Sequence, residues 1–352
     1  MKSIKWLVSV GLVIVLAMAF VLPACEPTDE EPEYTLKLQH SWGAGENHFF
    51  NNFADTVEDM SEGRMVVEVY SEGEICGYDE IPDAVASGLI DLGHTHPSFN
   101  LEVLEEGYME YTPYLWLTED QIRSALWDYG IANLTKEGIE ETFDVLVLDF
   151  QIDDLGGLLF SSPVNNISDM AGMTINVQPP YSDILDELVG ISAVYYSPED
   201  LWYNLAMNII DGLEWGGAVC MVDMDFHTAA ATGGVSGNGT LIQPYFIISW
   251  YPYYCITPSL WAGMDQEFQD ILMDAIAANT VYMRNYYLSN DASAKATMEA
   301  AGIEIVTLPE ADIEAIFQKL LVWLEEEFKP MTPRTELMYN ATMEALEAFG
   351  RI

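Results

Sequence analysis

The chain has 352 residues, of which 57 are acidic and 12 are basic, and its formal net charge is -45. This charge excludes nucleic acid as a partner, because phosphate recognition needs clustered Lys and Arg side chains. The acidic residues come in short groups and not in one long run, which favours a solvated surface over calcium buffering. Four cysteines without a CxxC pair or a zinc-type spacing exclude a disulfide scaffold. The length is typical of two domains with a sizeable core.

The first 24 residues have the order of a secretory signal peptide. Lys2 and Lys5 precede an apolar stretch over residues 6–22, and a small residue stands directly before Cys25. A retained membrane helix fits less well, because the stretch is barely long enough to span a bilayer and an acidic tail follows. We therefore predict a signal peptide over 1–24, lipid attachment at Cys25 and an acidic tether over 25–33. The mature protein is expected to be secreted and lipid-anchored, at the periplasmic or extracellular face of the membrane.

Strand and helix patterns alternate from residue 34 onward. The first of these patterns predict a βαβ unit. Its strands lie over 34–40, where apolar and polar residues alternate, and over 65–70, a β-branched run, and its helix lies over 47–61, where apolar residues have helical spacing. This unit opens a first lobe, which we predict over residues 34–152. The other elements predicted in this lobe are a helix over 79–87, a strand over 89–93, a helix from a capping box at 118–121 to Gly138, and a strand over 143–151.

A second lobe is predicted over 153–239, and the β-like run that follows suggests a return to the first lobe over 240–264. Long helices are expected over 265–352, spanning and packing on both lobes. Two sets of alternating elements joined by crossings predict a two-lobed α/β fold with a cleft between the lobes. The elements predicted beyond the first lobe lie at 158–161, 173–178, 181–189, 191–196, from Ser197, from Ile209, at 265–300, 303–306, 309–327 and 332–349.

The run 209–218 ends an apolar strand in an acid and an indole. Glu214 and Trp215 are followed by two glycines, which let the backbone approach whatever these side chains hold. The run predicts either a pocket wall or a buried strand whose Glu is solvated and whose Trp belongs to the core. The motifs around it decide between these interpretations.

Several motifs, taken in order, resemble one family. Residues 58–93 resemble the first lobe of the solute-binding proteins of TRAP transporters, the DctP family. The motifs that carry this resemblance are Ser-Glu-Gly-Arg at 61–64 and Ala-Val-Ala-Ser-Gly-Leu-Ile-Asp-Leu-Gly at 84–93. Residues 167–173 resemble a hallmark of the second lobe. The Glu-Trp pair at 214–215 resembles the subgroup that binds 2-oxo or hydroxy acids together with a metal ion.

The resemblance covers nearly the whole mature chain. It implies a periplasmic-binding-protein-like α/β fold with crossing strands and long C-terminal helices. It also implies an extracytoplasmic receptor that captures a small organic acid between its lobes and delivers it to the membrane permease subunits of a TRAP transporter. No catalytic step is implied.

Two positions depart from the family's pattern. Asn176 stands where the family usually places an arginine for the substrate carboxylate, and Asp154 stands where an amide ligand of the metal is expected. The region 249–252 carries no acid, although the subgroup supplies a further ligand there. The resemblance thus implies metal ligands at Asp154, Glu214 and Trp215. Two carboxylates in one desolvated cleft without an arginine need a positive partner.

Three kinds of ligand meet that need. Ca²⁺ or Na⁺ suits an oxygen-only set of ligands and can bridge to an organic acid, which is the interpretation we favour. Alternatively, the solute itself is cationic and binds the aromatic faces of Trp215, Trp250 and Tyr181. A neutral solute requires that one of the two acids is protonated.

Further residues and other classes of function stay open. Trp250 and Tyr251 are assigned to the site because they lie on the expected crossing between lobes, and His94 is expected to touch the ligand at most. A secreted hydrolase with Asp154 and Glu214 as acid and base is one alternative class, which a turnover assay tests. A sensor lipoprotein that binds a partner kinase or an envelope component is the other.

Overall fold

The computed structural model describes residues 31–152, 155–233, 238–244 and 249–352, apart from the side chain of Glu199. Residues 1–33 and residues 34–352 form two separate units, and the description below concerns the second. The predicted signal peptide and Cys25 lie outside the described residues. Within the described ranges, no helix is both long and apolar enough to cross a membrane.

The first sheet has five strands in the spatial order β2 (Met65–Tyr70), β1 (Tyr34–His40), β3 (Leu92–Thr95), β10 (Tyr253–Ile256) and β4 (Leu146–Phe150). β1 pairs in parallel with β2 and β3, and β10 is antiparallel to both of its neighbours. In β1, Leu36 and Leu38 are buried and Lys37 between them is exposed, as strand alternation predicts. β10 comes from far along the chain, so three connections between strands join this sheet to the rest of the fold, one after β4, one before β10 and one after β10.

Helices cover the first sheet with faces of regularly spaced apolar residues. In α2 (Asn47–Met60), the buried side chains Phe49, Phe50, Phe53 and Val57 recur at helical spacing. The other short and long helices of this part are η1 (Ala44–Glu46), α3 (Ile81–Ala86), η2 (Pro97–Asn100), η3 (Glu105–Tyr111), α4 (Glu119–Trp127), α5 (Ile131–Phe143) and α10 (Pro258–Gly263).

The helix predicted to run from the capping box to Gly138 is two helices, α4 and α5. The cap itself is present, because the Thr118 side chain accepts a hydrogen bond from the backbone N–H of Gln121. The break falls at Gly130, which adopts a left-handed φ of 81°. Glycine tolerates that backbone conformation at little cost, so it ends one helix and starts the next.

The second sheet has six strands in the order β11 (Ile303–Thr307), β9 (Gly239–Gln243), β5 (Gly157–Phe160), β8 (Gly212–Trp215), β6 (Thr174–Asn176) and β7 (Ser192–Val194). β8 therefore lies in the interior of the sheet, antiparallel to β5 and parallel to β6. At Gly212, an added Cβ would lie 2.4 Å from the Phe160 ring, so only glycine lets β8 approach β5 this closely.

The expected return to the first lobe at residue 240 is wrong. β9 pairs with β5 and with β11, and Leu158 lies opposite Ile242 in the second sheet. The chain returns only at β10, where Tyr253 pairs with Thr95 and Phe150 of the first sheet. An apolar β run indicates a buried strand, but its pattern does not say which of two sheets the strand joins.

Short helices surround the second sheet and position its strand ends. Asn166 and Asp169 form a capping box at the start of η4 (Ile167–Met170), within the segment that resembles the family hallmark. The remaining helices of this part are α6 (Tyr181–Val189), α7 (Pro198–Ala206), α8 (Ala218–Asp223) and α9 (Phe226–Gly233).

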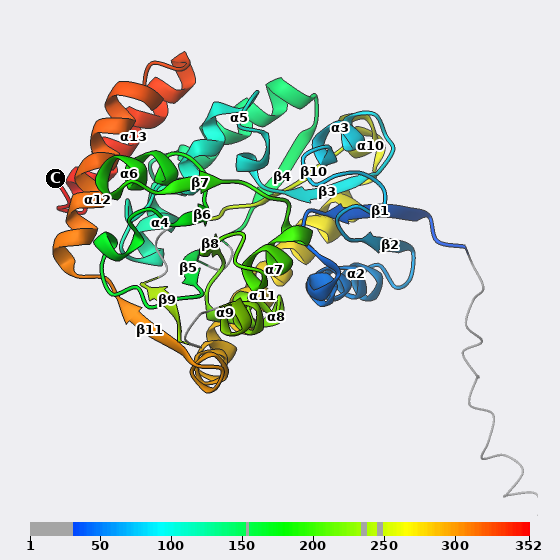
Figure 1. Ribbon diagram of the computed structural model, residues 1–352. Helices are drawn as coiled ribbons and strands as arrows, with labels where there is room; N and C mark the ends of the chain where they lie inside the picture. The colour runs from blue at the N-terminus through cyan, green and yellow to red at the C-terminus, as the bar shows by residue number, and fades with distance from the viewer. Residues whose placement is uncertain (1–30, 153–154, 234–237, 245–248) are drawn as a thin grey trace, which may run out of the picture. The chain divides into compact units, whose positions relative to one another are not determined.

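The longest helix, α11 (Gln266–Ala300), spans both sheets (Figure 1). It packs on α2 and β4 of the first lobe and on α8 and β11 of the second. Its predicted bounds of 265–300 are confirmed within one residue.

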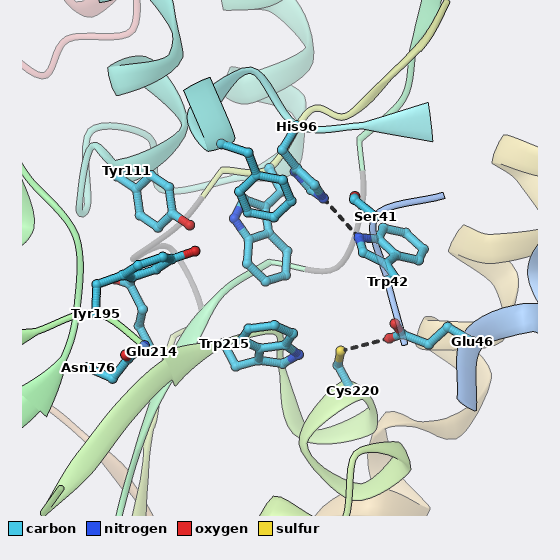
Figure 2. A pocket seen from close by; sticks show the side chains of 12 residues that line it. Ser41, Trp42, Glu46, His96, Tyr111, Asn176, Tyr195, Glu214, Trp215 and Cys220 are labelled. Carbon is cyan, nitrogen blue, oxygen red and sulfur yellow. Dashed lines mark hydrogen bonds between the residues drawn. The ribbon is translucent and has the colours of Figure 1, made fainter. Parts of the chain in front are cut away.

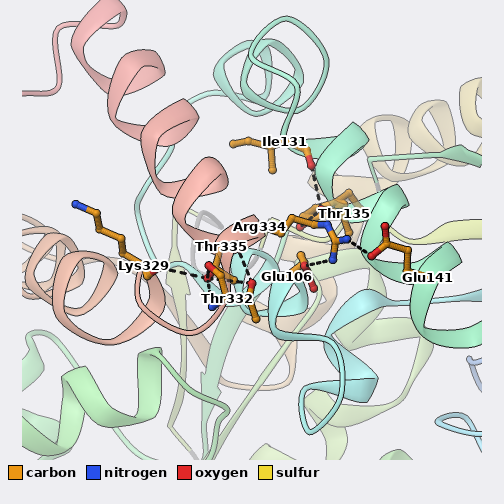
Figure 3. Close-up of polar contacts among 9 residues, drawn as sticks. Glu106, Ile131, Thr135, Glu141, Lys329, Thr332, Arg334 and Thr335 are labelled. Atoms are coloured by element: carbon orange, nitrogen blue, oxygen red, sulfur yellow. Dashed lines mark hydrogen bonds and ion pairs between the residues drawn. The ribbon is translucent and has the colours of Figure 1, made fainter.

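The C-terminal helices also join both parts. α12 (Glu310–Trp323) continues through a π-helical turn, η5 (Leu324–Phe328), and packs on α6, whereas α13 (Pro333–Ala348) packs on α4, α5 and η3. Arg334 at the start of α13 forms ion pairs with Glu106 of η3 and Glu141 of α5 (Figure 3). These pairs fix the last helix to the first lobe.

Candidate functional site

A cavity lies between the two sheets and is lined from both sides (Figure 2). Its volume is about 20 Å³, room for about one water molecule, so the side chains around it nearly close on one another. Most of its wall comes from residues that lie in or within a few residues of the strand ends of the two sheets. The lining residues are Ser41, Trp42, Glu46, His96, Phe99, Tyr111, Asn176, Tyr195, Glu214, Trp215, Cys220 and Trp250.

Glu214 is the acid at one end of this cavity. It lies near the end of β8, opposite Leu158 of β5, and only 3% of its surface is exposed. One carboxyl oxygen, Oε1, accepts a hydrogen bond from the backbone N–H of Gln178 at 3.2 Å. The other, Oε2, has no partner among the described residues. Burial raises the pKa of Glu214 well above its usual value, which the single backbone donor opposes only in part.

Phenol rings surround the Glu214 end of the cavity. The Tyr111 hydroxyl accepts a hydrogen bond from Nε2 of Gln178 at 3.0 Å, so Gln178 connects the phenol with the Glu214 carboxyl. Burial raises the pKa of Tyr111 and Tyr195, and the nearby Glu214 charge raises both further. These phenols stay protonated and cannot supply the positive charge that an ionised Glu214 needs.

No Lys or Arg side chain of the described residues lines the cavity. Several of these cations instead form pairs elsewhere, such as Arg64 with Glu267 and Arg284 with Glu119. Asn176, which stands in place of the expected arginine, is buried, and its Oδ1 accepts the backbone N–H of Tyr196 at 2.8 Å. An ionised Glu214 therefore needs positive charge from what binds there.

A buried hydrogen-bond relay holds the aromatic wall of the first lobe. Nε1 of Trp42 donates to Nε2 of His96 at 2.9 Å. An indole N–H can only donate, so the His96 ring is the neutral tautomer with its proton on Nδ1. That nitrogen lies 3.2 Å from Oε1 of Glu110, which also accepts the backbone N–H of Tyr251 at 2.8 Å. Oε2 of Glu110 accepts the backbone N–H of Ser98 at 3.0 Å, so one buried carboxylate fixes both chain segments.

Four of the predicted site residues line the cavity together: Asn176, Glu214, Trp215 and Trp250. They come from three different segments, the ends of β6 and β8 and the residues before β10. The indole N–H of Trp215 has no partner among the described residues. Asp154 lies outside the described residues, so its position relative to Glu214 is not part of the structure.

Three other predicted site residues do not line the cavity. Tyr181 is fully buried at the start of α6. The Tyr251 ring packs on Phe150, and its backbone N–H is bound by Glu110. His94 lies one layer behind the wall, where its ring contacts Trp42 and its Nε2 lies 2.8 Å from Nε2 of Gln151. The His94 ring thus supports a wall residue, Trp42, from behind.

The sequence interpretation missed the first lobe's contribution to the cavity. Trp42 lies two residues after β1, and His96 directly follows β3, at the carboxyl ends of parallel strands. Ligands of open α/β sheets gather at such ends, so this rule is a signal that could have found both residues. The residues missed in the sequence are Ser41, Trp42, Glu46, His96, Phe99, Tyr111, Tyr195 and Cys220.

Comparison with known proteins agrees with this architecture. The family model for bacterial extracellular solute-binding proteins of family 7, DctP, matches residues 40–330. A solute-binding protein of Roseobacter denitrificans is 23% identical over 309 residues, which cover 85% of this chain and 90% of the relative. A monocarboxylate 2-oxoacid-binding periplasmic protein of a Nostoc species is 21% identical over 295 residues, covering 81% of this chain and 76% of the relative.

Among solved structures, a TRAP periplasmic solute-binding protein of Colwellia psychrerythraea with bound calcium and pyruvate superposes with a TM-score of 0.76. Its sequence is 19% identical, and the match covers 90% of this chain and 95% of that one. The predicted two-lobed α/β fold is confirmed. The chain belongs to the family 7 extracellular solute-binding proteins, the receptors of TRAP transporters.

Proposed function

We propose that this receptor captures a small organic acid in the cavity between its sheets and delivers it, unaltered, to the TRAP membrane permease subunits. One observation carries the proposal. Glu214 places a buried carboxyl oxygen without a partner in a cavity that no Lys or Arg of the described residues lines. An organic acid binds beside the ionised form of this carboxyl only if a cation accompanies it.

A bound Ca²⁺ or Na⁺ fits the donors at this end of the cavity. Glu214 offers a carboxylate oxygen, and the Trp215 carbonyl at the end of β8 is the second oxygen donor that we propose. Within the described residues, no group of three or more His, Cys, Asp or Glu side chains could hold a metal. The site therefore depends on Asp154, on backbone carbonyls and on the solute's own carboxylate for its remaining ligands. The relatives with a 2-oxoacid, or with calcium and pyruvate, support this arrangement.

Lipid attachment at Cys25 is part of the proposed function, because a tethered receptor stays close to a membrane permease. The sequence before Cys25 supports it. Metabolic labelling with a fatty acid tests this step. The wild-type chain is expected to carry the label, and a Cys25→Ser chain is expected to lose both the label and the membrane fraction.

Thermal unfolding with a library of small carboxylates, amines and polyols tests the proposed solute class. The soluble body, without its first 33 residues, is measured with CaCl₂ or NaCl and again with a chelator in a sodium-free buffer. We expect carboxylates to raise the unfolding temperature only when the cation is present. Stabilisation by carboxylates without any metal ion contradicts the bridging cation, and stabilisation by amines alone contradicts the organic acid.

The Glu214→Gln variant removes the charge that holds the cation and is expected to lose the stabilisation by carboxylates. Glu304→Gln is the matched control, because Glu304 is an exposed acid on β11 of the same sheet. Its response to carboxylates is expected to equal that of the wild type. NMR of the recovered solute checks that it is released unchanged, and conversion of the solute contradicts a receptor without turnover.

A further inference from the structure

The cavity between the two sheets is nearly closed. Its volume of about 20 Å³ holds about one water molecule, and its wall combines side chains of both lobes. A solute of several heavy atoms can enter such a space only when the lobes move apart. Polar contacts that cross the cavity therefore control access to it, because they have to break before a solute can enter or leave.

The first of these contacts is buried and lies beside Glu214. Tyr111 ends η3, which packs on η2 and α5 of the first lobe. Gln178 lies two residues after β6 of the second sheet. Its side-chain Nε2 donates a hydrogen bond to the Tyr111 hydroxyl at 3.0 Å, and Tyr111 and Gln178 are only 3% and 8% exposed. Because water does not reach this bond in the closed protein, removing one partner leaves the other unsatisfied.

The second contact marks the mouth of the cavity. Tyr195 directly follows β7, lines the cavity and is 43% exposed, so its ring reaches from the cavity to solvent. Its hydroxyl hydrogen-bonds the hydroxyl of Tyr78. Tyr78 belongs to the first lobe, where its ring packs on Phe99 at a centroid distance of 4.9 Å and its carbonyl accepts the Thr95 hydroxyl. The two tyrosines therefore join the lobes at the edge of the cavity.

We propose that the contacts Tyr111–Gln178, inside, and Tyr78–Tyr195, at the mouth, form a clasp that holds the lobes closed and sets how often the cavity opens. A hydrogen bond weakens steeply outside a narrow range of distances and angles, so separation of the lobes breaks both contacts. The four side chains are positioning residues, since they hold one lobe against the other. The inference goes beyond the proposed function, because it concerns access to the cavity whichever solute binds there.

Cys220 reports the opening without any solute. Its thiol lines the cavity on the second lobe, is 4% exposed and donates a hydrogen bond to Glu46 of the first lobe (Figure 2). A thiol reagent reaches it when the lobes separate. Two cysteines that do not line the cavity are internal controls, the half-buried Cys76 and the fully buried Cys255 of β10. Alkylation with iodoacetamide, followed by mass spectrometry of the peptides, gives one rate for each thiol.

Two variants each remove one hydroxyl of the clasp and keep the ring, Tyr111→Phe and Tyr78→Phe. Each is expected to alkylate Cys220 about fivefold faster than the wild-type body, the effect of one lost hydrogen bond, and the double variant faster still. The rates at Cys76 and Cys255 are expected to stay as in the wild type. Tyr203→Phe, which changes an exposed tyrosine of α7, is the matched control and should leave the Cys220 rate unchanged.

A further variant separates the clasp from a general effect of substitution. Gln178→Met removes the donor of the buried bond from the other lobe, so it should match Tyr111→Phe, and combining the two should add little. Equal Cys220 rates in the wild type and in the clasp variants contradict the proposal. A rise at Cys255 in step with Cys220 also contradicts it, because unfolding then exposes the thiol. These rates need no solute, so failure of every carboxylate to bind contradicts the proposed function alone.

Discussion

The carboxyl group of Glu214 is shielded from water by the interior strand β8 and receives one backbone hydrogen bond, from Gln178. No cation of the described residues reaches the cavity. Burial therefore favours the neutral acid in the empty protein, and the proposed function has the loaded protein hold the carboxylate beside a cation. Binding and protonation of one side chain are thereby coupled.

This coupling predicts a pH dependence of the ligand-free body. Burial raises the pKa of Glu214 in the folded state above that in the unfolded chain, where a glutamic acid titrates near about 4.3. Between these two values the unfolded chain is ionised and the folded protein is protonated, so stability falls as pH rises, by about 1.4 kcal/mol per pH unit. Above the folded-state pKa the loss levels off.

Urea unfolding of the wild type and of Glu214→Gln between pH 4 and pH 8, in chelator, measures this effect. The difference in unfolding free energy between the two proteins should move in favour of the variant as pH rises. Parallel curves for the two proteins would show that Glu214 ionises as freely in the folded state as in the unfolded chain.

Glu110 is a positioning residue for the aromatic wall. Both of its oxygens accept hydrogen bonds, from His96, Tyr251 and Ser98, and the side chain is fully buried. In Glu110→Gln, an amide NH₂ replaces one acceptor and faces a donor. We expect a loss of about 2–3 kcal/mol in unfolding free energy, the range for hydrogen bonds to a buried charge.

The matched control is Glu102→Gln, an exposed acid of the same segment, which should stay within about 0.5 kcal/mol of the wild type. NMR of ¹⁵N-labelled His96 reports its tautomer and separates positioning from a general loss of stability. The wild type is expected to carry the proton on Nδ1. The opposite tautomer in the wild type contradicts the relay.

At the scale of elements, the local sequence pattern predicted the bounds of the helices and strands more closely than it predicted which strands pair with one another. The long apolar periodicity of α11 places its start and end within one residue of the prediction. Two errors have different physical causes. The break at Gly130 follows from the left-handed backbone of a glycine, whereas the sheet joined by β9 depends on contacts with distant segments, which a local period of 2 does not encode.

The anchoring of α13 is one such distant contact. Glu106 is a buried acid, 2% exposed, and Arg334 is its cationic partner at 2.9 Å. Arg334→Ala leaves the Glu106 charge without that partner, and we expect a loss of about 3 kcal/mol in unfolding free energy. Arg123→Ala is the control, because Arg123 pairs with Glu119 on the surface, and it should cost at most about 1 kcal/mol. Similar losses for both variants, measured by urea unfolding, would mean that the α13 pair has no special role.

At the scale of the whole molecule, the cavity is lined by residues from segments that are far apart in the sequence. Glu214, Trp215 and Asn176 were predictable because they end strands and lie in recognisable motifs. Trp42 and His96 follow strands of the other sheet, whose ends are a signal that could have found them, whereas nothing near Glu46 in the sequence marks a ligand. Only the pairing of β1 with β3 and the packing of α8 against α11 and α11 against α2 bring them to the same cavity.

The acidic surface also acts at this scale. The full chain carries a formal net charge of -45, and this excess of acidic residues makes the folded body repel itself. Salt screens that repulsion within about 3 Å at 1 M. We expect the unfolding temperature in chelator to rise by more than about 2 °C between 0.05 and 1 M NaCl, the shift that ~1 kcal/mol gives in a large domain. Sorbitol at equal osmolality serves as the control. No rise, or a rise no larger than in sorbitol, contradicts a repulsive surface.

The central claim is that the solute arrives with the positive charge that Glu214 lacks. Proton release on binding tests it most directly. A carboxylate that stabilises the body with CaCl₂ is titrated by calorimetry at pH 5.5 in two buffers of different ionisation enthalpy. We predict release of up to about one proton per solute by the wild type, because the buried acid ionises on binding, and at least about tenfold weaker binding without release by Glu214→Gln. Equal heats in both buffers, together with unchanged affinity of the variant, would contradict the account.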